Sequence, residues 1–161
     1  MSTPLNTTIY NEIEARLANV TTTNGYSSEF KRIERGTMKP FKSHDLVAVN
    51  FWAASVSSDN EKYTRDRRTI QVFFEVYDKT RDTPFMDICD SLAADLVTGL
   101  NRTILAPAVS DVESPELGEL VDKFIFNGYD YQIGEGQSPW CGILARFTVD
   151  FLTTSNNMIT I

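Results

Sequence analysis

The spacing of apolar residues predicts an amphipathic helix near the start of the chain. From residue 5 to residue 20, apolar side chains recur every three or four positions and so share one face of a helix. Thr3 is suited to cap this helix and Pro4 to occupy its first position, where the missing N–H is not needed. The pattern stops before the TTTNG sequence that ends at Gly25. The predicted apolar stripe consists of Leu5, Ile9, Ile13, Leu17 and Val20.

In the middle of the chain the pattern changes to a period of two, which predicts strands. Residues 46–52 are rich in β-branched and aromatic side chains, and residues 67–79 alternate between apolar and polar. Because residues 53–62 are polar, we expect a long β-hairpin joined by a polar loop that projects into solvent. Residues 26–43 predict only a short strand or an ordered arm. The strand face that we expect to be buried consists of Ile70, Val72, Phe74 and Val76.

A second amphipathic helix is predicted from residue 85 to residue 100, after the same Thr-Pro pair as the first. Cys89 belongs to its apolar stripe, and we therefore expect it to behave as a small buried hydrophobe. Residues 101–118 have few periodic apolar positions and predict a loop. Residues 120–132 and 141–154 predict two further strands. The apolar face of the last strand consists of Ile143, Ala145, Phe147, Val149 and Phe151.

The order helix, strands, helix, strands indicates an α+β fold and not the strand–helix alternation of a parallel sheet. We expect a mostly antiparallel, twisted β-sheet with two α-helices packed on one face. With 161 residues, the chain is expected to form a single domain, residues 1–161. The C-terminal tail, residues 154–161, is expected either to be flexible or to add to the sheet edge of a partner.

The charges of the chain are segregated along the sequence. The formal net charge of −7 argues against broad binding to nucleic acid or to an anionic membrane. Cations nevertheless concentrate in residues 31–42 and 65–68, and carboxylates in residues 87–122. Such zones suit contacts with other proteins or with further copies of the chain, whereas a solvated face is the simpler interpretation of any single charge run. No signal peptide or membrane-spanning run is expected, and two cysteines indicate free thiols in a reducing compartment.

The sequence GEGQSPWCG, residues 134–142, is the stretch most similar to a phosphate-binding loop or a thiol active site. A dinucleotide-binding fingerprint needs a third glycine and a following helix, whereas a strand follows here. A thioredoxin-type site needs a second cysteine near Cys141, and a cysteine hydrolase would need His44, the one histidine, as its base. We therefore expect a stiff turn that starts a strand, with no catalytic residue and no cofactor.

Metal binding and carboxylate catalysis have little support in the sequence. One histidine and two cysteines on different elements do not supply a zinc set, and the chain has no calcium-loop pattern. Glu135, Asp130 and Asp150 could pair as acid and base, but such pairs arise freely in an acidic chain. A small-molecule site on the apolar face of the sheet is a further alternative.

Several features follow one another in a recognisable order along the chain. The first are an amphipathic N-terminal helix, Gly25-Tyr26, the basic segment FKRIERG and a strand that ends at Trp52. They are followed by the strand RRTIQVFFEVYDK, the helix MDICDSLAADLVTGL, the Glu-Leu-Gly at residues 116–118 and the final alternating strand. This order resembles that of the tail terminator, or tail completion, proteins of long-tailed bacteriophages, and the resemblance covers nearly the whole chain.

This resemblance implies a non-enzymatic, structural role in the virion neck, with assembly in the host cytoplasm. Such proteins cap the finished tail tube as a ring, expected to be a homohexamer, stop tube polymerisation and face the head connector. The implied partners are further copies of the chain, the tail tube protein and head–tail connector or neck proteins, with transient contact to DNA that passes through the ring lumen. The alternatives are another neck protein, such as a head-closure protein, or a small hydrolase that uses Cys141 and His44.

A ring requires a heterologous interface, in which one side of a subunit fits the opposite side of its neighbour. We expect the arginines at 65–68 to contact acidic residues of a neighbour or of the tail tube, or else to line the DNA channel. Trp140, in the predicted hairpin loop from Gly134, is expected to be exposed and to anchor a partner surface. The expected interface residues are Lys31, Arg32, Arg35, Arg65, Arg67, Arg68 and Trp140.

Overall fold

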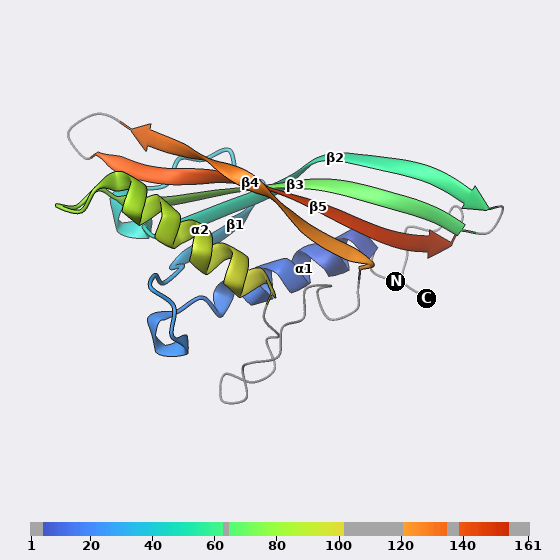
Figure 1. The fold of residues 1–161 in the computed structure, drawn as a ribbon, viewed down its shortest axis with the longest axis horizontal. Coiled ribbons are helices and arrows are strands. Elements are labelled where there is room, and N and C mark those ends of the chain that lie inside the picture. Colours follow the sequence, from blue (N-terminus) through green and yellow to red (C-terminus); the bar gives the residue numbers. More distant parts are fainter. Residues whose placement is uncertain (1–4, 63–64, 102–120, 135–138, 155–161) are drawn as a thin grey trace.

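The computed structural model describes residues 5–62, 65–101, 121–134 and 139–154, which form two α-helices and five β-strands (Figure 1). The α-helices are α1 (Leu5–Ala18) and α2 (Phe85–Asn101), and short 3-10 helices cover Thr22–Asn24 and Ser43–Asp45. The strands are β1 (Arg32–Arg35), β2 (Ala48–Lys62), β3 (Arg65–Lys79), β4 (Lys123–Gly134) and β5 (Trp140–Thr154).

All five strands belong to one sheet in the order β1-β2-β3-β5-β4. Only β1 and β2 run parallel, and the other neighbouring strands are antiparallel. Both helices lie on the same side of the twisted sheet, with α1 toward β1 and α2 against β5 and β4 (Figure 1). The predicted α+β class, a mostly antiparallel sheet with helices packed against it, is confirmed.

The hydrophobic core lies between the helices and the inner face of the sheet. Phe147 of β5 is central to it, because its ring centroid lies 5.1 Å from that of Phe74, 4.9 Å from that of Phe124 and 5.2 Å from that of Phe126. Cys89 is fully buried in the same cluster, as predicted. Both predicted strand faces are confirmed, with exposures of at most 2% for Ile70, Val72, Phe74, Val76, Ile143, Ala145, Phe147, Val149 and Phe151.

The two helices are held close to each other at Gly99 of α2. A Cβ atom at this position would overlap the Cγ2 methyl group of Val20, which follows α1. Glycine is therefore needed for this approach, although it costs about 1 kcal/mol relative to alanine inside a helix. The contact fixes the C-terminal half of α2 against the first helix and its following turn.

The prediction of a polar loop at residues 53–62 is wrong. These residues continue β2 as far as Lys62 and pair with β3, with Ser57 opposite Thr69 and an irregularity after Ala53. The predicted hairpin is present, but its strands are longer than expected. Residues 54–59 are all exposed, so their polarity marks a solvated ribbon and not a reversal of the chain.

Some of the remaining predicted elements lie within the described residues, and others lie outside them. The strand expected within residues 26–43 is β1, and the strand predicted at 120–132 is β4. The Thr3 cap with Pro4, the loop after Asn101 and the tail after Thr154 lie outside the described residues. Neither α-helix that the structure describes is long and apolar enough to cross a lipid bilayer.

Candidate functional site

The face of the sheet that α1 and α2 leave uncovered carries several aromatic side chains. Trp52 of β2 and Phe73 of β3 are cross-strand partners there, with ring centroids 5.8 Å apart and ring planes inclined by 14°. The solvated face of an antiparallel sheet is usually dominated by polar residues. An aromatic surface on that face is typical of a site that contacts a partner or a ligand.

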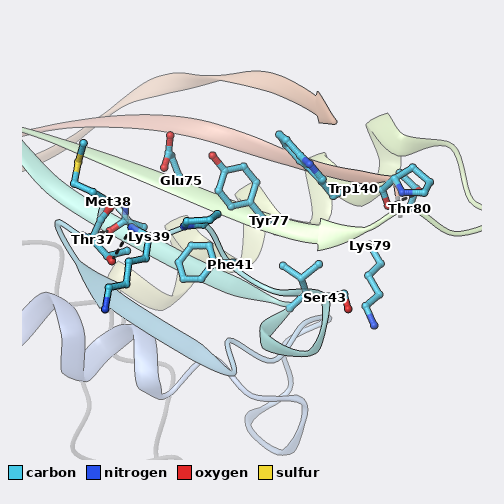
Figure 2. Close-up of a pocket in the computed structure, with 14 residues that line it drawn as sticks. Thr37, Met38, Lys39, Phe41, Ser43, Glu75, Tyr77, Lys79, Thr80 and Trp140 are labelled. Atoms are coloured by element: carbon cyan, nitrogen blue, oxygen red, sulfur yellow. Dashed lines mark hydrogen bonds between the residues drawn. The ribbon is translucent and has the colours of Figure 1, made fainter. Parts of the chain in front are cut away.

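One end of this face is hollowed into a groove of about 790 Å³ (Figure 2). Its floor is the C-terminal part of β3, from Glu75 to Lys79. Residues 37–46, between β1 and β2, form one side, while Pro139 and Trp140 at the start of β5 close one end. The groove thus joins three segments that are far apart in the sequence.

Three aromatic rings from these segments form a row along the groove. The ring centroids of Phe41 and Tyr77 lie 6.2 Å apart, and those of Tyr77 and Trp140 lie 4.8 Å apart in an edge-to-face arrangement. The guanidinium carbon of Arg32 lies 5.5 Å from the centroid of Phe41. This cation–π contact stabilises the position of the Phe41 ring. Aromatic rows of this kind bind aliphatic and proline side chains of extended peptides.

The orientation of Trp140 depends on Gly134, its partner across β4 and β5. The indole ring lies against Gly134, and a Cβ atom at that position would overlap it. Together with Tyr77, this contact leaves Trp140 only partly exposed. The expectation of an exposed Trp140 in a loop is therefore wrong, because this residue begins β5. Residues 135–138, the middle of the predicted loop, lie outside the described ranges.

Hydrogen bonds hold the side of the groove in place. The Thr37 N–H donates to Asn50 Oδ1 at 3.1 Å, and Asn50 Nδ2 donates to the Thr37 carbonyl oxygen at 3.2 Å. Asn50 is buried, so both bonds are shielded from water. On the floor of the groove, burial and the nearby Glu75 carboxylate raise the pKa of Tyr77.

Two exposed lysines, Lys39 and Lys79, lie toward opposite ends of the groove (Figure 2). In the part of the chain that the structure describes, neither ammonium group forms an ion pair. Glu75 is the one carboxylate among the lining residues, and it lies beside Tyr77. The groove therefore combines an aromatic interior with two cations that are available to an acidic partner.

The predicted interface arginines near β1 form ion pairs within the chain. Arg32 Nε lies 2.8 Å from Glu34 Oε1, and Arg32 Nη1 lies 2.7 Å from Asp45 Oδ2. Arg35 Nη2 lies 2.6 Å from Glu14 Oε2. Both arginine side chains are about one-third exposed, so a partner can still reach them. Their contact with a second chain stays a prediction.

The arginines near the hairpin tip are also engaged within the chain. Arg67 Nη1 lies 3.5 Å from Asp122 Oδ2, and Arg68 Nη2 lies 2.9 Å from Oδ2 of the buried Asp66. The side chain of Arg65 lies outside what the structure describes. The seventh predicted position, Lys31, is exposed and lines a second, more polar hollow of about 530 Å³. The predicted cations thus occupy two separate regions, and none of those whose side chains the structure describes lines the aromatic groove.

The cysteine and histidine that were considered as an active site lack the features of one. Cys141 is fully buried, and burial raises the pKa of its thiol. Cys89 donates a hydrogen bond from Sγ to the Gly142 carbonyl oxygen at 3.2 Å, and burial raises its pKa to about 12. His44 is exposed beside Asp45. A nucleophilic thiol needs access and a lowered pKa, so Cys141 is suited to packing and not to attack.

The considered carboxylates are not brought together either. Asp130 pairs with Arg146 at 3.3 Å, whereas Asp150 accepts a hydrogen bond from Thr69 at 2.7 Å. The strand partner of Asp130 is Leu144, and Asp150 lies six residues further along β5. Glu135 lies outside the described residues. Among the described side chains, no group of three or more His, Cys, Asp or Glu is placed to hold a metal ion.

The groove was not predicted as a site from the sequence. Alternation along β3 did place Tyr77 on the outer face beside Phe73, and two aromatic residues on a predicted solvent face were a usable signal. Met38 and Phe41 fall in a stretch without periodicity. They come to lie over β3 because β1 pairs with β2 and the intervening residues fold back across the sheet.

Comparison with known proteins does not assign the chain to a family. No family model matches the sequence, and no curated protein matches it. Evidence on function therefore comes from the geometry and the charges described above.

Proposed function

We propose that this chain is a structural protein of virion assembly, a tail terminator that caps the finished tail tube as a hexameric ring. In this role the ring stops tube polymerisation and faces the head connector. The order of elements along the sequence supports this identity. The structural observation that carries the proposal is that the two lateral sides of the sheet bear opposite charge.

The basic side is the edge formed by β1 and the segment that follows it. Residues 31–42 contain five lysines and arginines and one carboxylate. Lys31, Lys39 and Lys42 are exposed, and β1 is the first strand in the spatial order of the sheet.

The acidic side is the opposite edge, formed by β4 and by α2, which packs on β5 and β4. α2 contains three aspartates and neither lysine nor arginine. Asp90 of this helix and Asp130 of β4 are exposed, and Asp90 accepts hydrogen bonds from Tyr129 and Tyr131 of β4. Asp87 is also exposed, but it lines the same polar hollow as Lys31 and so does not belong to the acidic side.

Opposite charges on opposite sides favour head-to-tail association over a two-fold dimer. In a head-to-tail contact the basic side of one copy meets the acidic side of the next, and the arrangement closes into a ring when the rotation per subunit is right. Complementary charges also speed the encounter and fix the register of the subunits. A two-fold contact through either edge would instead place like charges together.

The two alternative functions, another neck protein and a small hydrolase, differ in the surface or site that they require. A head-closure or other neck protein would use the same kind of surface, and tail length separates it from a terminator. The hydrolase alternative loses support because its thiol, Cys141, is buried with a raised pKa.

The deciding experiment is electron microscopy of tails assembled in cells that lack this protein. A terminator predicts overlong tubes without heads. Tails of normal length that lack heads would indicate a neck protein instead, and normal complete particles would contradict any role in the neck.

A charge exchange tests the ring itself. Lys31→Glu with Lys42→Glu, or Asp90→Lys with Asp130→Lys, should each prevent ring formation on the tube, because like charges then meet. The chain with all four changes should recover it, because the exchanged charges are again complementary. Failure of the combined variant, despite correct folding, would contradict the proposed contact.

A further inference from the structure

We infer that the aromatic groove of one copy is the docking site for the acidic segment of a neighbouring copy, within residues 107–119. This inference rests on the proposed ring and names the contact that links adjacent subunits. Of the predicted interface residues whose side chains the structure describes, Trp140 alone lines the groove. The groove contains aromatic side chains, unpaired lysines at its ends and an almost fully exposed methionine, Met38, with 97% exposure.

The chemistry of the groove defines what it can hold. The row formed by Phe41, Tyr77 and Trp140 offers an apolar surface to aliphatic and proline side chains of an extended chain. Lys39 and Lys79 offer ammonium groups to carboxylates toward its two ends. A suitable occupant is therefore acidic, contains proline and aliphatic residues and carries few cations.

The chain itself contains such a segment between α2 and β4. After Arg102, this segment has no lysine or arginine before Lys123. Each of the other segments outside the described residues contains at most one aspartate or glutamate, whereas this segment contains four. Its relevant residues are Pro107, Asp111, Glu113, Pro115, Glu116, Leu117 and Glu119.

The C-terminal part of this segment is too short to reach the Trp140 end of the groove in its own copy. Its C-terminal end is fixed because the Asp122 N–H donates to the carbonyl oxygen of Asp150 at 2.8 Å. Trp140 lies ten residues from Asp150 along β5, which corresponds to about 33 Å. Glu116 precedes Asp122 by six residues and so reaches at most about 22 Å from it. Carboxylates at 116 and 119 that contact the Trp140 end of a groove must therefore come from another copy.

Fluorescence of Trp140 provides a direct test. The protein has two tryptophans, so a full-length chain with Trp52→Phe reports on Trp140 alone. A synthetic peptide with the sequence of residues 107–120 should change this fluorescence saturably. The same peptide with Glu113→Lys and Glu116→Lys is the matched control, and it should bind about tenfold more weakly, because two rim contacts become repulsive.

Exchange of charge on the protein completes the test. Lys39→Glu with Lys79→Glu, both exposed positions, should weaken binding of the native peptide about tenfold and improve binding of the lysine peptide. The inference is overturned if the native peptide leaves Trp140 unchanged up to millimolar concentration, or if reversal of the lysines has no effect. A response to purified tail tube protein but not to the peptide would overturn it in favour of that partner.

The peptide assay requires neither a ring nor a tail, so the two proposals can fail separately. Peptide binding with normal tails in cells without the protein would contradict the terminator function only. Overlong tails together with an inert groove would contradict the docking contact only.

Discussion

Arg16 of α1 donates a hydrogen bond from Nη1 to the carbonyl oxygen of Leu100 in the last turn of α2, at 2.7 Å. The last carbonyls of a helix have no partner within that helix, so this guanidinium satisfies one of them from inside the core. Arg16 is 1% exposed, and its Nε also lies 2.8 Å from Glu12 Oε1. The two helices are therefore joined by a charged side chain and not by apolar contacts alone.

Arg16→Met should lower the free energy of unfolding by about 1.5–3 kcal/mol, the range for a hydrogen bond to a charged group. Urea titration followed by circular dichroism measures this change. Arg146→Met is the matched control, because Arg146 pairs with Asp130 while both side chains are exposed, by 41% and 60%, and should cost less than about 1 kcal/mol. Equal costs for the two variants would contradict the assigned role of Arg16.

Gly134→Ala should displace the indole of Trp140, because the added Cβ atom overlaps that ring. We expect a loss of about 1–3 kcal/mol in stability, typical of overpacking, and a shift of Trp140 emission. In a Trp140→Ala background the same change should become neutral or stabilising by up to about 1 kcal/mol, since alanine is then the better residue. A double-mutant cycle in urea measures this reversal of sign, and additive effects would argue against the stacked contact.

Stability should fall at alkaline pH partly because of Cys89. Burial raises the pKa of its thiol to about 12 from an ordinary value of 9.0, so the unfolded chain loses this proton first as pH rises. The contribution of the protonated thiol is complete below about pH 9 and is lost progressively toward pH 12, by up to about 1.4 kcal/mol per pH unit. Unfolding free energies of Cys89→Ala should decline less steeply over this range, whereas parallel curves would contradict the prediction.

The Asp90 carboxylate should become a weaker acid when Tyr129 is replaced. Both Tyr129 and Tyr131 donate to Asp90 Oδ1, at 2.5 and 2.7 Å, and these hydrogen bonds lower the pKa of Asp90. Tyr129→Phe should therefore raise that pKa, and Tyr131→Phe should raise it by a smaller amount. Carbon NMR of the carboxyl group during an acid titration measures both shifts, and an unchanged pKa in Tyr129→Phe would refute the assignment.

The sequence predicted most of the fold because its periodicities report burial directly. The stripe through Ile9 and Ile13 and the alternation through Val72 and Val149 mark side chains that face one core. Residues 53–62 were misassigned because polarity reports exposure and not chain direction. A strand that is solvated on both faces has the composition of a loop, and only its pairing with β3 identifies it.

The groove was less predictable than the fold because it depends on contacts between distant residues. The floor at Tyr77, the side at Phe41 and the end at Trp140 meet through three strand pairings, β1 with β2, β2 with β3 and β3 with β5. The close approach of Trp140 requires Gly134, but a glycine in a sequence does not reveal which ring lies on it. The cations were predicted from clustering alone, which does not show that Arg32 and Arg68 would find carboxylates in their own chain.

The strand order has a consequence for synthesis on the ribosome. β5 is the last strand of the described chain to be translated, yet it lies between β3 and β4 and is the only described neighbour of β4. Until residues 140–154 have emerged, β3 keeps an open edge and β4 has nothing to pair with. A product of translation that stops before β5 therefore cannot complete the sheet. If the chain forms an oligomer, only copies whose translation has passed Thr154 have the complete sheet with which to join it.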